Sequence, residues 1–185
     1  TSDGVSTELD IPASIRRGPA MVYAEDPLND TNWNLLTNPK LDSTTGWTAT
    51  SVTAAAYARS INDHLVPKLE NACIKLTSGA SGNYSQALGS SLASAMAGRK
   101  FSFGCWVYSL TPGCTVGITD DAATAVSDAH NGDGWEFLQV TRNVSGTNAT
   151  TLTVKITPGT NNAVFVERAY AGQIARIPIS YTNFI

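Results

Sequence analysis

The sequence predicts an all-β protein: a β-sandwich that follows an extended N-terminal arm and includes one short helical connection. Between residues 32 and 172, short β-like runs are separated by clusters of Gly, Asn, Ser and Pro, which is the pattern of a sandwich or barrel. Several runs alternate apolar and polar side chains with a period of two, as half-buried strands do. Before residue 32, prolines interrupt the chain and no periodicity is sustained.

Composition limits the classes of function. The chain has 185 residues, of which 42% are hydrophobic, enough to bury one good core. Charged residues make up 15%, and 12 basic against 15 acidic residues leave a net charge of -3. This balance offers no electrostatic footprint for nucleic acid. No apolar run reaches the roughly 18 residues that a membrane-spanning helix needs. We therefore expect neither a nucleic acid nor a membrane as partner.

Residues 1–31 are predicted to be an anchoring arm. Pro12, Pro19 and Pro27 interrupt this stretch, which also carries the basic pair Arg16-Arg17. Such an arm gains its backbone hydrogen bonds from a surface that it lies on, so we expect it to run across a neighbouring subunit. Arg16, Arg17 and Pro19 are its candidate assembly residues. Because the chain begins at Thr1 rather than Met and ends on Ile185 in mid-pattern, we expect processing or trimming at one or both ends.

The sandwich opens between residues 34 and 47. Leu35 and Leu36 predict an opening strand, which a turn separates from Leu41 and from Trp47. We interpret these apolar residues as the first strand and corner of the core. Further along, residues 72–76 read as a strand, and Tyr84-Ser85-Gln86 as another strand step.

One helix and one strand stand out in the middle of the chain. Residues 91–97 contain good helix formers and are followed by Gly98, a natural helix stop, so they predict one or two helical turns. Residues 101–108 show the clearest strand alternation. One face would carry Phe101, Phe103, Cys105 and Val107, and the other Ser102, Gly104, Trp106 and Tyr108.

The last elements follow the same logic. Residues 131–134 (Asn-Gly-Asp-Gly) form a strong turn signal before a strand that begins at Trp135. Leu152, Val154 and Ile156 share one face of a later strand, and residues 164–167 close the sandwich. The tail, residues 173–185, stays apolar, with Pro178 limiting any strand there to an edge. We expect it to return to the sandwich or to dock on a partner.

These pieces, in this order, resemble the galactose-binding-like jelly rolls of carbohydrate-binding modules and of phage tail-fibre and virion proteins. In those families the opening is similar to Asn-Leu-Leu-x-Asn, followed by an acid and a Trp; here Asp42 follows Leu41, and Pro39 replaces the common Gly. The resemblance continues to about Tyr170. It implies a jelly roll over residues 32–172, between the arm and the tail.

The sequence shows no catalytic constellation, and we predict that the protein is not an enzyme. The two histidines, His64 and His130, each have a nearby acid but lie in turn-like polar sequence, so we expect surface histidines. Four acids between residues 120 and 133 lack calcium-loop spacing and are expected in solvent-facing turns: Asp120, Asp121, Asp128 and Asp133. Cys73, Cys105 and Cys114 are expected to be reduced thiols, with Cys114 in a turn.

Sugar binding is the sharpest functional hypothesis. Trp106 and Tyr108 would form an aromatic platform that stacks on sugar rings, and Trp33 and Tyr57 would border it. The alternative is that this face is covered and that Trp47, Trp106 and Trp135 belong to the core.

The resemblance also implies a structural calcium ion near the junction of the first and last strands. The matching acids are Asp42 and Glu167, and Arg168 next to Glu167 offers a counter-charge in place of a metal. No other cofactor is expected.

We interpret the chain as a non-enzymatic bacteriophage virion structural protein: a fibre, adaptor or capsid-decorating subunit. Its jelly roll would serve assembly with other virion subunits, as a homo-oligomer, and would also contact host glycans. The alternative is a secreted, extracellular carbohydrate-binding module of a glycan-degrading enzyme. The arm discriminates between the two, because an independent sugar-binding module does not need one.

Overall fold

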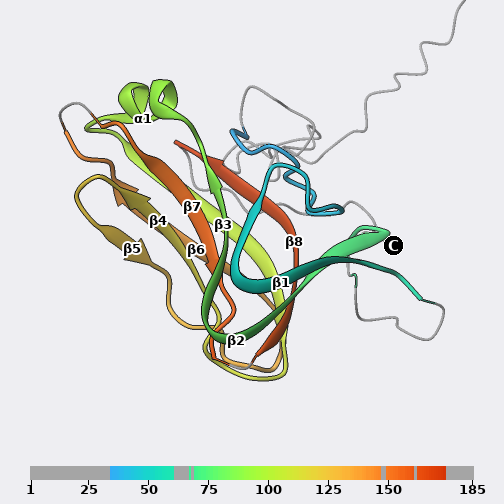
Figure 1. Cartoon of the computed structure of the whole chain (residues 1–185). Coiled ribbons are helices and arrows are strands. Elements are labelled where there is room, and N and C mark those ends of the chain that lie inside the picture. Colours follow the sequence, from blue (N-terminus) through green and yellow to red (C-terminus); the bar gives the residue numbers. More distant parts are fainter. Residues whose placement is uncertain (1–33, 61–66, 68, 147–148, 161, 174–185) are drawn as a thin grey trace, which may run out of the picture.

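The computed structural model confirms an all-β sandwich with one short helix (Figure 1). It describes residues 34–60, 67, 69–146, 149–160 and 162–173. The predicted arm, with Arg16, Arg17 and Pro19, therefore lies outside the described residues, as do Trp33, His64 and residues 174–185. In the described part the elements are β1 (Thr48–Ala58), β2 (Ala72–Ala87), α1 (Ser90–Met96), β3 (Lys100–Ser109), β4 (Thr115–Asp120), β5 (Thr124–Val126), β6 (Gly134–Asn143), β7 (Leu152–Thr157) and β8 (Ala163–Gly172).

All strand pairs are antiparallel, and β2 links the two layers of the sandwich. The strand order is β5-β4-β7-β2-β8-β3-β6, and β1 pairs with β2. The first half of β2, Ile74 to Thr77, pairs with β8, whereas its last four residues, Tyr84 to Ala87, pair with β7. One long strand thus belongs to both layers. None of the helices in the described ranges is long and apolar enough to cross a membrane.

The core lies between the layers and follows the predicted alternation. Phe101, Phe103, Cys105 and Val107 of β3 are fully buried, as are Val154 and Ile156 of β7. Trp47 stacks on Tyr84 with ring centroids 5.2 Å apart. The hydroxyl of Tyr84 is buried, and burial raises its pKa to about 12.

The opening segment is in the core, but the predicted opening strand is wrong. Residues 34–47 form turns, with Asn38 and Leu41 at positive φ. Asn34 anchors the segment to β8: its side-chain amide donates to the Ala169 carbonyl at 3.0 Å and accepts from the Ala171 amide at 3.2 Å. Backbone hydrogen bonds add to this anchor: the Leu35 amide donates to the Ala171 carbonyl at 2.9 Å, and the Ala169 amide to the Pro39 carbonyl at 2.7 Å. Leu41 and Trp47 are buried, as predicted.

The helix is confirmed with a shift of one residue. It spans Ser90–Met96, and Gly98 after it has a φ of 70°, a left-handed conformation that suits glycine. Ala93 and Met96 are its buried residues, so α1 closes one end of the sandwich (Figure 1).

Asp120 corrects the expectation of a solvent-facing turn. Its side chain is fully buried and forms a two-pronged ion pair with Arg142 of β6, at 2.9 Å and 2.8 Å. It also accepts hydrogen bonds from the backbone amides of Ala122, Ala123 and Ser145. Buried carboxylates need such partners. The other acids of this group, Asp121, Asp128 and Asp133, are exposed as predicted.

His130 is likewise buried rather than at the surface. Its Nδ1 accepts from the Gly132 amide at 2.8 Å, which makes Nε2 the protonated nitrogen. Nε2 lies 3.2 Å from the Val107 carbonyl and 3.1 Å from the Gly134 carbonyl. The imidazole therefore joins β3 to the start of β6 and holds the predicted turn in place.

The three cysteines are free and buried, which agrees with the prediction of reduced thiols. Cys114, which was predicted to lie in a turn, is fully buried immediately before β4. Burial raises the pKa of the Cys114 thiol to about 12 and that of Cys105 well above its ordinary value. Thiols held protonated in this way behave as small apolar side chains.

Candidate functional site

Six half-buried aromatic side chains gather on the outer side of the β1-β2-β8-β3-β6 layer, away from the core. Strand alternation explains the direction of Trp106, Tyr108 and Phe165, because their neighbours along β3 and β8 are buried on the opposite face. We call this surface the aromatic face. Its members come from β1, β3, β6 and β8: Tyr57, Trp106, Tyr108, Trp135, Phe137 and Phe165.

Cross-strand register brings these rings together. Tyr108 of β3 lies opposite Trp135 of β6 on one side and Phe165 of β8 on the other. Trp106 lies opposite Phe137. Directly opposite side chains have Cβ atoms about 4.5–5.5 Å apart, close enough for rings to touch.

The ring geometry makes one continuous row across four strands. Trp135 and Tyr108 have centroids 5.5 Å apart, Tyr108 and Phe165 6.1 Å, and Phe165 and Tyr57 4.9 Å. These pairs are tilted or edge-to-face, the arrangement that the quadrupoles of aromatic rings favour. The row is therefore held in a defined orientation by its own contacts.

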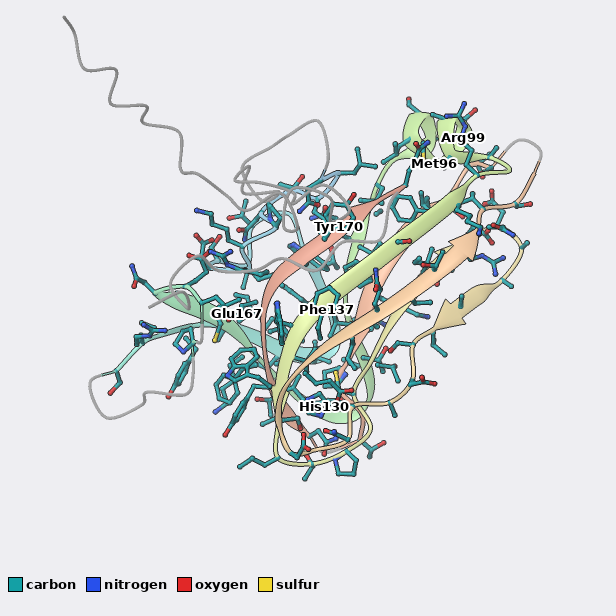
Figure 2. All side chains as sticks on the ribbon, turned by 180° about the vertical axis from the view of Figure 1, so that it is seen from behind. Met96, Arg99, His130, Phe137, Glu167 and Tyr170 are labelled. Carbon is teal, nitrogen blue, oxygen red and sulfur yellow. The ribbon has the colours of Figure 1, made fainter. Side chains whose placement is uncertain are left out.

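A second pair lies beside this row. Trp106 and Phe137 meet edge-to-face at 5.5 Å. Phe137 lies against β3, as Figure 2 shows from behind, and fits there because Gly104 has no side chain. A Cβ atom at Gly104 would stand 2.5 Å from the Phe137 ring. Gly104 thus sets the position of Phe137, which in turn supports Trp106.

Two polar side chains accompany the rings. Lys75 of β2 lies opposite Phe165, and its ammonium nitrogen is 5.7 Å from the ring centroid, within cation–π range. Gln139 of β6 lies opposite Gly104. Its Nε2 is buried and has no hydrogen-bond partner among the described residues. Of these two groups, the Lys75 ammonium is the donor that the face presents beside its apolar area.

The two predicted calcium ligands differ in their exposure to solvent. Asp42 is exposed, whereas Glu167 is fully buried and its Oε1 accepts from the Leu69 amide at 2.9 Å. Arg168 forms an ion pair with Glu70 at 2.6 Å. Within the described ranges no group of three or more His, Cys, Asp or Glu side chains is arranged to hold a metal. The calcium site stays a prediction.

Three of the four predicted platform residues meet on the aromatic face: Trp106, Tyr108 and Tyr57. The fourth, Trp33, lies outside the described residues. Sequence reasoning missed Phe137 and Phe165 and assigned Trp135 to the core. The alternation around residues 135–139 and 163–167 was a usable signal. Only the pairing of β6 and β8 with β3 shows that these aromatic residues lie next to Trp106 and Tyr108.

No protein-family model and no curated protein sequence matches this chain. Solved structures do. It is similar to a family 61 carbohydrate-binding module in complex with β-1,4-galactotriose, at 14% identity over 76% of this chain and 99% of that one, with a TM-score of 0.51. It is also similar to a family 22 carbohydrate-binding module with xylanase modules from Clostridium thermocellum, complexed with xylohexaose. That match has 10% identity and covers 80% of this chain and 30% of the other, with a TM-score of 0.60.

A third similar structure is the enzymatically active domain of tailspike protein 4 of bacteriophage CBA120. The identity is 16% and the TM-score 0.52, over 76% of this chain. The chain spans about a fifth of that structure's length, 21%. At these identities the likenesses show the fold, a jelly-roll sandwich of the kind that carbohydrate-binding modules have.

Proposed function

We propose that the chain is a non-enzymatic glycan-binding jelly roll and that the aromatic face is its binding site. The observation that carries the proposal is the row of half-exposed rings across β6, β3, β8 and β1. Ring faces of this kind stack on the apolar faces of sugar rings, and binding sites are commonly lined by aromatic side chains with a few polar groups. The bound ligands of two similar structures, galactotriose and xylohexaose, support the same ligand class.

A virion is the setting that we propose for this activity, with the chain as a fibre, adaptor or capsid-decorating subunit of a bacteriophage. The likeness to a phage tailspike domain and the proline-interrupted residues 1–31 favour this setting. A secreted module of a glycan-degrading enzyme is the second candidate. It is favoured by the match to a family 61 module over 99% of that module's length.

Replacing Trp106 tests the binding site. Trp106→Ala should weaken retention on an immobilised polysaccharide by about tenfold, because an anchoring aromatic ring is lost. Retention is measured by affinity electrophoresis, after a glycan array has selected the polysaccharide. Val126→Ala, at an exposed position of β5 in the other layer, is the matched control and should bind normally. Unchanged retention by a folded Trp106→Ala protein would contradict the proposed site.

The setting is tested by the mass of the purified chain in solution, with and without residues 1–30. A virion subunit should form an oligomer that depends on those residues. If both forms are monomers that bind polysaccharide equally, the secreted-module function holds and the assembly role is wrong.

A further inference from the structure

We propose that the glycan bound at the aromatic face is acidic and that Lys75 selects it by pairing with the carboxylate or sulfate of a sugar stacked on the ring row beside Phe165. The inference rests on the proposed function and adds a substrate class to it. It comes from one juxtaposition: a cation placed over a ring that belongs to the binding row.

The position of Lys75 is fixed by the sheet. On β2 it lies between Ala55 of β1 and Phe165 of β8, so its stem runs across the layer and its ammonium nitrogen lies 5.7 Å from the Phe165 centroid. Phe165 also contacts Tyr57 and Tyr108. A sugar stacked on the row would therefore meet Lys75 at the same time.

The charge of Lys75 is available to a ligand. Its side chain is partly exposed, and in the described part of the chain no carboxylate forms an ion pair with it. An ammonium group has three donors and no acceptor, and the aromatic ring cannot use them all. Hydrogen bonds between an ammonium and an anionic group are stronger than those between neutral groups. An acidic sugar is the ligand that complements this arrangement.

The nearby acidic residues do not neutralise the charge that Lys75 presents to a ligand. Glu70 is paired with Arg168. Glu167, which lies on the same side of β8 as Phe165, is fully buried and accepts a hydrogen bond from the Leu69 amide. The competing interpretation is that Lys75 only balances the buried Glu167. In that case Lys75 would affect stability and not the choice between acidic and neutral glycans.

The test compares one polymer in two charge states. The full chain is titrated with polygalacturonate, with its fully methyl-esterified form and with a sulfated galactan. We expect tighter binding of one or both acidic polymers than of the ester, weakened by salt as screening predicts. Lys75→Gln should weaken the affinity for the acidic polymer by about tenfold and leave the affinity for the ester unchanged. The two acidic polymers distinguish carboxylate from sulfate as the recognised group.

Controls separate charge from fold. Lys75→Arg should keep the acidic preference. Lys155→Gln, on β7 in the other layer, removes the same charge from a half-buried lysine and should behave like the unmodified chain. Equal binding of ester and acid, or an acidic preference that survives Lys75→Gln, would overturn the inference and leave the proposed function standing. No binding to any glycan, on the array or here, would overturn both.

Discussion

Gly104 shows how one missing side chain shapes the candidate site. Phe137 occupies the space above it, and Trp106 rests edge-to-face on Phe137. The backbone of Gly104 needs no left-handed conformation, so the requirement is for space alone. This distinguishes Gly104 from Gly132, which has a φ of 89° in the turn before β6.

Gly104→Ala should therefore displace Phe137, destabilise the fold by about 1–3 kcal/mol and weaken glycan retention. Gly146 is the matched control, because a Cβ atom there would meet no atom within 4 Å. Gly146→Ala should change both quantities little. Urea unfolding and affinity electrophoresis measure them, and equal behaviour of the two variants would show that Phe137 is not held by Gly104.

Among the elements, β4 and β6 are joined by the ion pair of Asp120 and Arg142. The hydrogen bonds from the Arg142 guanidinium hold the pKa of the Asp120 carboxyl well below its usual range, and the backbone amides that donate to Asp120 make a smaller contribution in the same direction. The Asp120 side chain is fully buried, so its charge needs these partners.

This ion pair predicts a dependence of stability on pH. Since the pKa of Asp120 is lower in the folded state, the stabilisation is fully present above the unfolded-state pKa of about 3.9. It is lost as the pH falls further towards the folded-state pKa. Asp120→Asn should have a lower melting temperature at pH 7 and a smaller fall between pH 7 and pH 3. Thermal unfolding followed by circular dichroism across that range checks this, and parallel profiles for the two proteins would contradict it.

Local pattern predicted the elements well and the polar anchors poorly. The faces of β3 and β7 follow from alternation within each strand, which needs no knowledge of the partner. Asp120 and His130 were expected at the surface because their sequence neighbours are polar. Their burial depends on Arg142 and on Val107, which are 22 and 23 residues away. The aromatic face was half found for the same reason, because β6 and β8 bring Phe137 and Phe165 to β3 only in the fold.

At the scale of the whole molecule, the shared strand β2 connects the two layers of the sandwich. It pairs with β1 along its length, with β8 in its first half and with β7 at its end. Without β2, β7 in one layer and β8 in the other would each lose a paired strand. The low share of charged residues, 15%, leaves stability mainly to the common core.

We therefore expect the sandwich to unfold in a single cooperative transition. Far-ultraviolet circular dichroism reports the strands. Tryptophan fluorescence reports both Trp47 in the core and Trp106 and Trp135 on the outer layer. The two signals should give the same midpoint in urea. Two separate midpoints would show that the layers unfold independently despite β2.

Phe165 gives the aromatic face a property that its separate residues lack. Tyr57, Tyr108 and Lys75 all contact this one ring. Contacts that share a partner are energetically coupled, so losses from single substitutions at these positions do not sum. Specificity at this face is thus collective: a change of ligand would require neighbouring positions to change together, around a ring that stays the same.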